Sequence, residues 1–377
     1  MFLMGPSLLF DKSAFESLSR DEHRVAFQYF FNVLPPILAL EIVADLQKIE
    51  PGATPETLVT RLAGKFLGSG PPIHVGHTLL LRNDLMAADI QMTGRPYPDS
   101  LVPVPDHGLG AGIYIPTTPT NEAILRWSRG EFRDDEREIA RAWRAAKLNF
   151  PVEDLTKTLE SRGVEIARAP NLGALNAQTA ALVNNPELSS LWIDWLLNKA
   201  GIIDRERAYV WDRWLRSRVP FATFSPYGHY CMAVDLRFII ASRSELIRVR
   251  ETDLLDVQYL YYVPFFNVLV SDDTLHVRLA PLGMREDQDF AKGVDFKSDI
   301  RARLGEEEKL DDAARKRREF ALGFYPTPRS GSIVSRVWKR HCRPWKPGMG
   351  NNAVALSPEE RAEAIEEARV LFAASSD

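Results

Sequence analysis

The stretch Ser7-Leu8-Leu9-Phe10-Asp11 decides our interpretation of the fold. Its three consecutive apolar residues predict a short buried strand, and Asp11 stands where that strand ends. The residues after Asp11 favour a helix that begins at once, so this part of the chain predicts a strand-helix unit. Open α/β sheets bind ligands beyond the carboxyl ends of their strands. Asp11 is therefore a candidate site residue.

A second stretch, Leu269-Val270-Ser271-Asp272-Asp273, repeats the pattern late in the chain. Branched and aromatic residues from 265 to 270 predict a strand, and residues 253–262 predict a preceding helix that carries Asp256. If both strands lie in one sheet, Asp11 and Asp273 become neighbours although 262 positions separate them (273 minus 11). The two stretches would then be halves of one carboxylate site.

A third acid, Glu41, lies on a helix predicted over residues 37–46. Aromatic and branched residues at 27–34 predict a second strand before it, which ends at Pro35-Pro36. The first 50 residues thus predict two successive strand-helix units.

The composition is that of a globular protein. The chain has 377 residues, of which 45% are hydrophobic and 26% charged, enough for one elaborated domain or about two to three domains. A formal net charge of -4 argues against a protein that coats nucleic acid through its overall charge. Any site for a polyanion must then be a local patch.

Cysteine content and hydropathy indicate a cytoplasmic protein. Cys231 and Cys342 are the only cysteines, so a disulfide framework and a four-cysteine zinc site are excluded. No apolar run approaches the roughly 20 residues of a membrane span, and residues 1–10 lack the features of a signal peptide. We expect no membrane partner.

The strand-helix rhythm is interrupted in the middle of the chain. Residues 51–233 contain many short segments and prolines, which predicts a mostly helical insertion. The rhythm returns at 234–283, where 234–240 is apolar enough for a strand but also fits a helix. We therefore predict a discontinuous core of residues 1–50 and 234–283, followed by a helical C-terminal extension over 284–377.

The acids in this context resemble the PIN-domain superfamily of nucleases. In that family an Asp closes the first strand, a Glu lies on a helix after the second, a late helix carries an Asp, and a Ser/Thr-x-Asp closes a later strand. The matching positions are Asp11, Glu41, Asp256 and Ser271-Asp272-Asp273. The resemblance implies an α/β fold, with a PIN-like three-layer α/β/α core around a central parallel sheet.

The resemblance also implies a metal-dependent endonuclease that hydrolyses phosphodiester bonds, with RNA favoured over DNA. Mg²⁺ or Mn²⁺ would be the cofactor, because hard divalent cations bind carboxylate oxygens and activate water. In the four-acid metal site we expect Asp11 and Asp273 to bind the ion directly, Asp256 to help hold it, and Glu41 to position or partly activate water. Ser271 would orient a ligand or phosphate.

Two other interpretations remain open at this point. Each acid after an apolar run is also a typical helix cap or turn residue, and the chain could be a catalytically inactive PIN-like scaffold that binds RNA or protein. The large insertion suggests control by a protein partner or by self-assembly, as in a toxin or an antiviral defence effector. If the first and last strands did not share a sheet, the resemblance would be accidental.

A basic segment at 329–346 is the candidate nucleic-acid surface. Its cations and aromatic residues suit phosphate contacts and base stacking: Arg336, Trp338, Lys339, Arg340, Arg343, Trp345 and Lys346. The alternative is a solvated tail, or arginines paired with Glu306-Glu307-Glu308. A helix over 204–218, rich in arginine and tryptophan, is a second candidate, and the alternative is that its tryptophans face the core.

Other sites known to carry chemistry are poorly supported. His74 and His77 have the spacing of zinc ligands on a helix, but Gly76 and the neighbouring prolines disfavour that helix. The chain has no Gly-x-Ser-x-Gly nucleophile motif and no Walker loop. Acyl transfer and nucleotide hydrolysis are therefore not expected.

Overall fold

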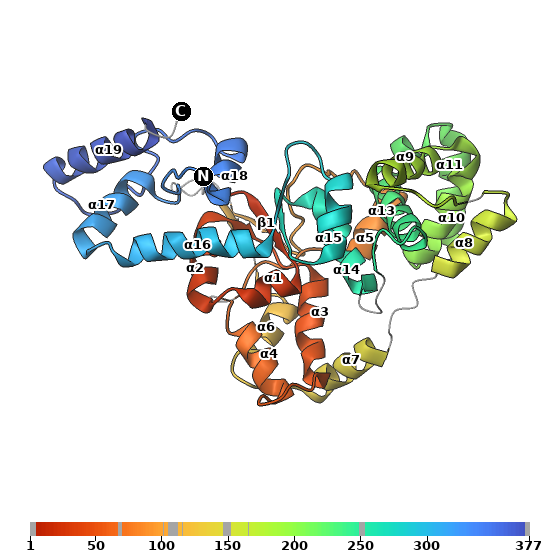
Figure 1. The fold of residues 1–377 in the computed structure, drawn as a ribbon, viewed down its shortest axis with the longest axis horizontal. Coiled ribbons are helices and arrows are strands. Elements are labelled where there is room, and N and C mark those ends of the chain that lie inside the picture. The colour runs from red at the N-terminus through yellow and green to blue at the C-terminus, as the bar shows by residue number, and fades with distance from the viewer. Residues whose placement is uncertain are drawn as a thin grey trace.

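Four short strands form one parallel sheet near the centre of the molecule (Figure 1). The spatial order is β2-β1-β5-β6, with bounds Phe31–Asn32, Ser7–Phe10, Val268–Val270 and Asp289–Ala291. β1 pairs with β5 in the register Leu8↔Val268 and Phe10↔Val270. The predicted α/β class and the shared sheet of the first and last predicted strands are thus confirmed.

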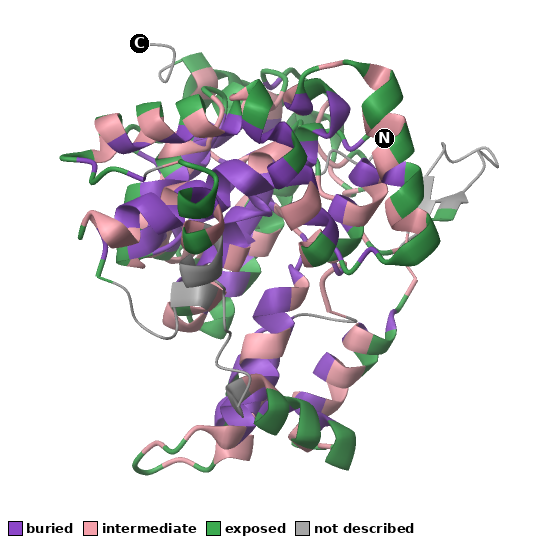
Figure 2. Ribbon diagram, turned by 90° about the vertical axis from the view of Figure 1, so that its right-hand side faces the viewer, coloured by how far each residue is buried: buried purple, intermediate pink, exposed green. Residues whose placement is uncertain are grey.

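The computed structural model describes most of the chain, namely residues 5–66, 70–100, 102–104, 112–114, 116–145, 152–164, 166–248 and 253–373. Within this part the core of buried residues follows the sheet and the helices beside it, as the central buried elements of Figure 2 show. Among the described residues, no helix combines the length and apolarity needed to cross a membrane.

Six helices connect or flank the strands. They are α1 (Lys12–Ser17), α2 (Arg20–Tyr29), α3 (Pro36–Ala44), α14 (Asp253–Leu260), α15 (Thr274–Leu279) and α16 (Gly293–Glu308), with short 3₁₀ turns η3 (Val263–Phe265) and η4 (Ala280–Leu282). α1 and α15 start directly after β1 and β5 because Asp11 and Asp273 cap them. Ser19 and Glu22 form a capping box at α2, which runs to Tyr29, so the first three residues of the strand predicted at 27–34 are helical and the sheet pairing is limited to β2.

The predicted insertion forms two groups of helices rather than one body (Figure 1). The lower group packs on α3 and comprises η1 (Asp45–Gln47), α4 (Pro55–Ala63), α6 (Pro119–Trp127) and α7 (Asp134–Ala145). The other group lies beside α14 and α15 and comprises α5 (His77–Leu85), α8 (Val152–Ser161), α9 (Leu172–Val183), η2 (Pro186–Leu188), α10 (Ser189–Lys199), α11 (Asp204–Ser217), α12 (Phe221–Phe224) and α13 (Pro226–Arg243). A small hairpin of β3 (Val102–Val104) and β4 (Gly112–Tyr114) completes the region.

The predicted ends of the late core segment, residues 234 and 283, are not domain boundaries in the structure. α13 runs through residue 234, so the apolar run 234–240 is helical. The run belongs to an 18-residue buried helix that starts at Pro226, and a segment of this length is too long for a strand. β6 lies after residue 283, so the sheet takes its fourth strand from the segment assigned to the C-terminal extension. That extension is otherwise helical, with α17 (Asp312–Leu322), α18 (Ile333–His341) and α19 (Pro358–Ala373) after α16.

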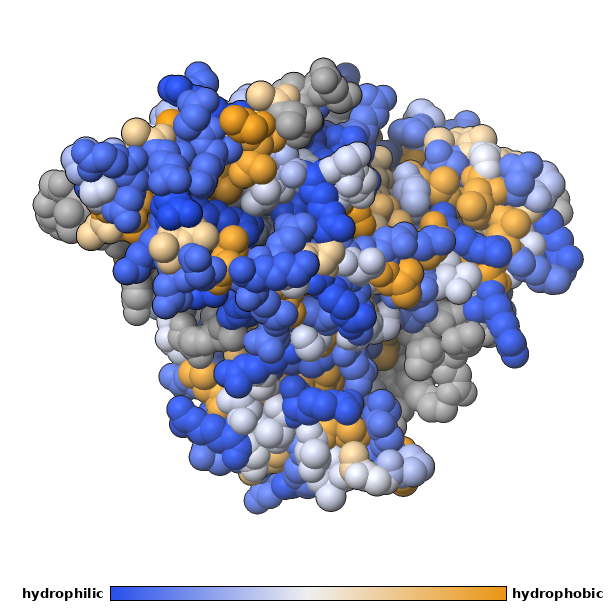
Figure 3. Space-filling model, turned by 60° about the vertical axis from the view of Figure 1, so that its left-hand side comes forward, coloured by the Kyte–Doolittle hydropathy of each residue, from blue (hydrophilic) through white to orange (hydrophobic). Residues whose placement is uncertain are grey.

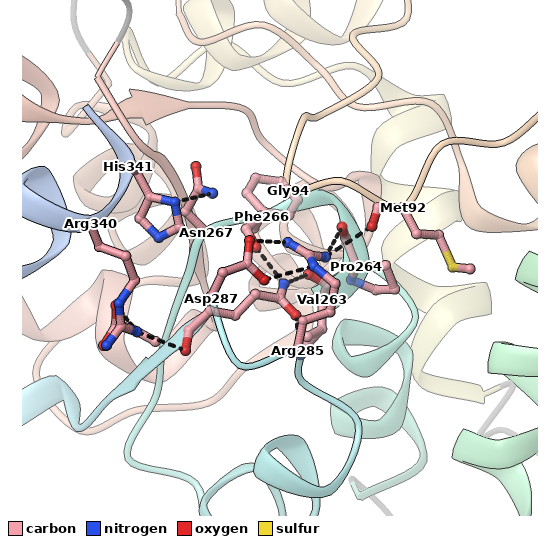
Figure 4. A network of polar contacts seen from close by, with 12 residues as sticks. Met92, Gly94, Val263, Pro264, Phe266, Asn267, Arg285, Asp287, Arg340 and His341 are labelled. Atoms are coloured by element: carbon pink, nitrogen blue, oxygen red, sulfur yellow. Dashed lines mark hydrogen bonds and ion pairs between the residues drawn. The ribbon is translucent and has the colours of Figure 1, made fainter. Parts of the chain in front are cut away.

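A polar network at the amino edge of the sheet joins three distant parts of the chain (Figure 4). Ser7 and Asn267 exchange hydrogen bonds, Ser7 N to Asn267 Oδ1 at 2.9 Å and Asn267 N to Ser7 Oγ at 2.8 Å. The Asn267 amide also contacts Nδ1 of His341 at 3.0 Å, at the end of α18. Arg285 donates to the carbonyl of Met92 at 3.0 Å. This edge therefore holds the insertion and the C-terminal extension against the sheet.

Candidate functional site at the carboxyl edge of the sheet

Asp11 ends β1 and is almost completely buried, with 2% of its surface exposed. Its Oδ1 accepts a hydrogen bond from the Ala14 amide at 2.7 Å, so one carboxylate oxygen caps α1. Its Oδ2 points toward the end of β5, where it meets Ser271 and His276. The capping interpretation and the site interpretation of this residue thus apply to different oxygens of one side chain.

Ser271 brings the two halves of the site together. Its hydroxyl donates to Asp11 Oδ2 and accepts from the Asp273 amide at 3.0 Å. The pairing of Phe10 with Val270 in adjacent parallel strands sets the next residues of both strands side by side. Asp11 and Asp273 are consequently linked through one hydroxyl group.

Sequence reasoning missed His276, which lies fully buried on α15. Its Nε2 contacts the Asp256 carbonyl at 2.7 Å, and its Nδ1 contacts Ser271 Oγ at 2.8 Å and Asp11 Oδ2 at 3.3 Å. A carbonyl can only accept, and the Ser271 hydroxyl already donates to Asp11, so both ring nitrogens must carry protons. The available signal was a titratable residue three positions after Asp273, in the short helix α15 that follows this acid.

The charge of His276 explains how Asp11 tolerates burial. Burial alone would lower the pKa of His276, but the hydrogen bond and charge of Asp11, together with Asp256, raise it to about 9. Burial alone would raise the pKa of Asp11, but His276, Ser271 and the Ala14 amide lower it below its usual value. The two side chains therefore form a buried ion pair at neutral pH.

Glu41 lies on α3 at the same edge and accepts a hydrogen bond from the Tyr259 hydroxyl. Burial raises the pKa of Glu41, and the charge of Asp11 adds to this effect, while Tyr259, Lys12 and His276 act against it. Burial also raises the pKa of Tyr259, with further contributions from Glu41, Asp11 and Asp256. Three of the four predicted acids thus act electrostatically on one tyrosine.

Asp256 and Asp273 complete the predicted set, and both are half-buried. Asp256 lies on α14 and offers its backbone carbonyl to His276. Asp273 uses Oδ1 to accept from the Leu275 amide at 2.7 Å, which caps α15. Asp272, which was not assigned a role, is exposed and accepts from the Val294 amide at the start of α16 at 3.3 Å. All the predicted acids therefore occupy the local positions expected for them.

The side chains fit a hard divalent cation by chemistry but do not frame one in this conformation. Carboxylate oxygens are the ligands that Mg²⁺ and Mn²⁺ prefer. Within the described ranges, however, no group of three or more His, Cys, Asp or Glu side chains is arranged to hold a metal ion. The Asp11 oxygen that faces the site is bonded to Ser271 and His276 instead. The cluster is balanced by an internal cation.

Ser271, His276 and Asp11 are not a nucleophilic triad despite their residue types. In such a triad the serine and the carboxylate bind opposite ring nitrogens. Here both contact Nδ1, and Nε2 is bonded to a backbone carbonyl. Ser271 is also fully buried. Acyl transfer by these residues is excluded by geometry.

The basic segment requires a correction, because its two tryptophans are core residues. Trp338 is buried and donates to the Tyr29 carbonyl at 2.8 Å. Trp345 is buried, donates to the Ala321 carbonyl at 2.9 Å, and stacks on Phe372 with ring centroids 5.0 Å apart. Trp338 thus joins α18 to α2, and Trp345 contacts α17 and α19, so the predicted stacking of these two rings on bases is wrong for this conformation.

The cations of the basic segment divide into two groups. Arg336 and Arg340 form ion pairs with Asp289, at 3.2 and 3.0 Å, at the first residue of β6. Lys339, Arg343 and Lys346 are exposed and remain available for phosphate contacts. Since Asp289 starts its strand, this surface lies at the amino edge of the sheet, opposite to the acids.

Figure 3 shows that the visible face is mostly hydrophilic, with larger hydrophobic areas on the lobe at its right.

The arginine- and tryptophan-rich helix α11 is largely engaged in structural contacts. Arg207 pairs with Asp194 at 2.5 Å, and Arg216 pairs with Asp212 at 2.8 Å. The Arg213 guanidinium lies 3.7 Å from the Phe224 ring centroid, and Trp214 packs on the same ring. This pattern agrees with the interpretation in which the tryptophans face the core.

His74 is a packing residue rather than a zinc ligand. It is buried, its Nδ1 contacts the Val75 carbonyl at 2.7 Å, and its Nε2 accepts from the Tyr97 amide at 3.1 Å. The His77 ring stacks on Tyr261, with centroids 4.6 Å apart. Both nitrogens of His74 are thus occupied, which excludes a paired zinc site here.

Comparison with known proteins adds no relative to this description. No model of a known protein family matches the chain, no curated protein is significantly similar, and no solved structure matches its fold.

Proposed function

We propose that the chain is a PIN-like endonuclease that depends on Mg²⁺ or Mn²⁺ and cleaves RNA. The observation that carries the proposal is the contact of Asp11 with Ser271 at the carboxyl ends of adjacent parallel strands. Glu41 and Asp256 both raise the pKa of Tyr259, and Asp256 also raises that of His276. Order along the chain, local structure and position at the sheet edge all agree with a PIN-like arrangement.

Asp11, Glu41, Asp256 and Asp273 would hold the metal ion. When bound, the ion would activate water and neutralise charge on the phosphate. Binding requires that Asp11 Oδ2 exchange its bonds to Ser271 and His276 for the cation. The released Ser271 hydroxyl would then orient a ligand or phosphate, and Glu41, whose pKa burial raises, would take a proton from water at its carboxylate.

The choice of RNA rests on the PIN resemblance. The exposed cations Lys339, Arg343 and Lys346 support binding of a phosphate backbone away from the acids. A substrate that reaches both edges of the sheet would have to cross β1, whose four residues span about 13 Å. An RNA segment of a few nucleotides is long enough for this.

One observation favours the inactive scaffold as a second candidate. The imidazolium of His276 already balances Asp11, and Lys12 pairs with Asp45 at 2.7 Å and contacts the Glu41 carbonyl at 3.2 Å. A carboxylate edge with internal cations can be stable without metal. The chain would then bind RNA or a protein partner without cleaving it.

A cleavage assay on labelled RNA and DNA, with Mg²⁺ or Mn²⁺ added, tests the proposal. The decisive variant is Asp11→Asn, which keeps the acceptor that caps α1 but removes the carboxylate charge. We expect RNA cleavage by the wild type and its loss, by at least about 100-fold, in Asp11→Asn, as for removal of a group that stabilises charge in the transition state.

Asp311→Asn is the matched control. Asp311 caps α17 and accepts from the Ala314 amide at 2.7 Å, the same distance as in the Asp11 cap. It should retain full activity. RNA binding without cleavage by the wild type under every metal condition would support the scaffold instead. Equal cleavage by wild type and Asp11→Asn would contradict the assigned site.

A further inference from the structure

We infer that His276 is a positioning residue that ties α14 to the carboxyl edge of the sheet and so holds Asp256 beside Asp11. The inference rests on the proposed function, because it concerns the same acids. It adds a residue for which the PIN resemblance assigns no role. It also identifies the element of the site that depends on it, the helix α14.

The imidazole of His276 contacts three separate elements. Nδ1 reaches Ser271 after β5 at 2.8 Å and Asp11 after β1 at 3.3 Å, while Nε2 reaches the Asp256 carbonyl on α14 at 2.7 Å. The ring is completely buried, so water does not compete for these bonds. A single rigid side chain thus sets the distance between α14 and both strand ends.

α14 needs such an attachment because it is short. The helix has eight residues, and isolated helices of that length are unstable in water, so tertiary contacts must hold it in place. Tyr259 supplies a second contact from the same helix face, three positions after Asp256. Its hydroxyl donates to Glu41, and its ring packs edge-on against His276 with centroids 5.7 Å apart.

Two conservative variants separate the two functions of the ring. Asn places its amide near the position of Nδ1 and can replace the bonds to Ser271 and Asp11, but it cannot reach the Asp256 carbonyl. Gln places its amide near Nε2 and can replace the bond to Asp256. Any effect caused by loss of the bond to the Asp256 carbonyl on α14 must therefore be larger in His276→Asn than in His276→Gln.

Amide hydrogen exchange of α14 is the primary readout, with α16 as the internal reference. In His276→Asn we expect the α14 amides to exchange roughly ten-fold faster, as for the loss of one buried hydrogen bond, with α16 unchanged. His276→Gln should stay near the wild-type rate. Both variants lose the same charge beside Asp11, so they can be compared with each other for Mn²⁺ affinity by calorimetry, and His276→Gln should bind Mn²⁺ more tightly than His276→Asn.

His23→Gln is the matched control. His23 is also fully buried, and its Nε2 contacts the Phe15 carbonyl at 2.9 Å, a bond that Gln can replace. It should leave α14 exchange unchanged. Equal α14 exchange in all variants, faster exchange in His276→Gln than in His276→Asn, or loosening of α14 by His23→Gln would each overturn the inference.

The wild-type protein provides a test that does not depend on the folding of a variant. The Nε2 proton of His276 should give a slowly exchanging, downfield imidazole signal with nuclear Overhauser effects to α14 protons, and absence of this signal would contradict the tie. The outcomes also separate the two proposals. If the variants show the predicted order of α14 exchange but the protein binds no Mn²⁺, His276 still attaches α14 to the sheet, and the proposed metal site is rejected. If the protein binds Mn²⁺ but the variants leave α14 exchange unchanged, the metal site is retained, and the role of His276 is rejected.

Discussion

The hydroxyl of Ser271 donates a hydrogen bond to the carboxylate of Asp11, a residue 260 positions earlier in the chain. This bond joins the ends of β1 and β5 directly, while His276 and the Asp273 amide contact the same hydroxyl oxygen. Ser271 is therefore the common point of the carboxylate edge. Its contacts allow predictions of how substitutions and pH change the stability of the protein.

Removal of the Ser271 hydroxyl should destabilise the fold. In Ser271→Ala, Asp11 loses a donor and the Asp273 amide loses its acceptor inside the core. We expect a loss of about 2 kcal/mol in the free energy of unfolding, the usual cost of buried polar groups left unpaired. Urea denaturation measures it. Ser17→Ala, which removes a half-buried hydroxyl bonded to the Ala14 carbonyl, should change stability by less than about 0.5 kcal/mol.

The ion pair of His276 and Asp11 predicts a stability that falls with rising pH. The folded protein holds the His276 proton up to about pH 9, while an unperturbed histidine releases it near 6.5. The stabilisation is therefore complete below pH 6.5 and declines as the pH rises toward 9. We expect His276 to contribute a loss of about 2 kcal/mol between pH 6.5 and 8. Burial lowers the pKa values of His23, His74 and His77, and these residues contribute a gain over the same range, so the His276 contribution must be measured as a difference from a variant without it.

The upper limit of that window is set by Lys65. Burial lowers the pKa of Lys65 to about 8, so above pH 8 the unfolded chain binds more protons at this residue, and stability gains from it. Denaturation should therefore be measured from pH 6.5 to 8. His276→Gln lacks this titration but keeps those of the other histidines and of Lys65, so the stability of the wild type minus that of His276→Gln should fall across this range. A constant difference would mean that His276 is neutral.

The exposed part of the basic segment should bind RNA without supporting the fold. Replacing Lys339, Arg343 and Lys346 by alanine should change stability by less than about 0.5 kcal/mol at each site. If these cations contact phosphates of single-stranded RNA, the slope of log affinity against log salt should fall by about 2. Fluorescence anisotropy at several salt concentrations measures this slope.

A variant with the same change in net charge serves as the control. Arg129, Arg133 and Arg162 are exposed in turns and loops next to α6, α7 and α8, and their replacement by alanine should leave the salt slope unchanged. Equal effects of both triple variants would show that overall charge, rather than the segment 329–346, controls binding.

The sequence was sufficient to predict the strand ends but not the bonds between them. Apolar runs before Asp11 and Ser271 have few alternative structures, so the parallel pairing of β1 with β5 is confirmed. The run at 234–240 is apolar except for Asp235 and Arg237, a pattern that fits a strand or a buried helix, and the length of α13 distinguishes them.

His276, Trp338 and Trp345 show a second limit. The sequence does not show which residues contact a histidine or tryptophan, because tertiary packing decides whether such a side chain is buried. Trp345 is in the core because Phe372 stacks on it from 27 positions away (372 minus 345), a contact that no local pattern predicts. The composition of the basic segment suggested an interface, but two of its seven candidate residues, both tryptophans, lie in the core.

Gly293 at the start of α16 should be intolerant of a methyl group. A Cβ added there would lie 2.5 Å from Asp272 Oδ2 and 3.3 Å from the Ala14 Cβ, so Gly293→Ala must displace either the Asp272 cap of α16 or α1 beside Asp11. We expect a loss of about 1–3 kcal/mol, typical of overpacking in a closely packed site.

Gly305 in the same helix provides the matched comparison. No atom lies within 4 Å of a Cβ added at Gly305, so Gly305→Ala should raise the free energy of unfolding by about 0.5–1 kcal/mol through helix propensity alone. Urea denaturation of both variants tests the opposite signs. If Gly293→Ala stabilised the protein as Gly305→Ala does, α1 and α16 could not be packed as closely at the carboxyl edge as the structure has them, and the placement of Asp11 would need revision.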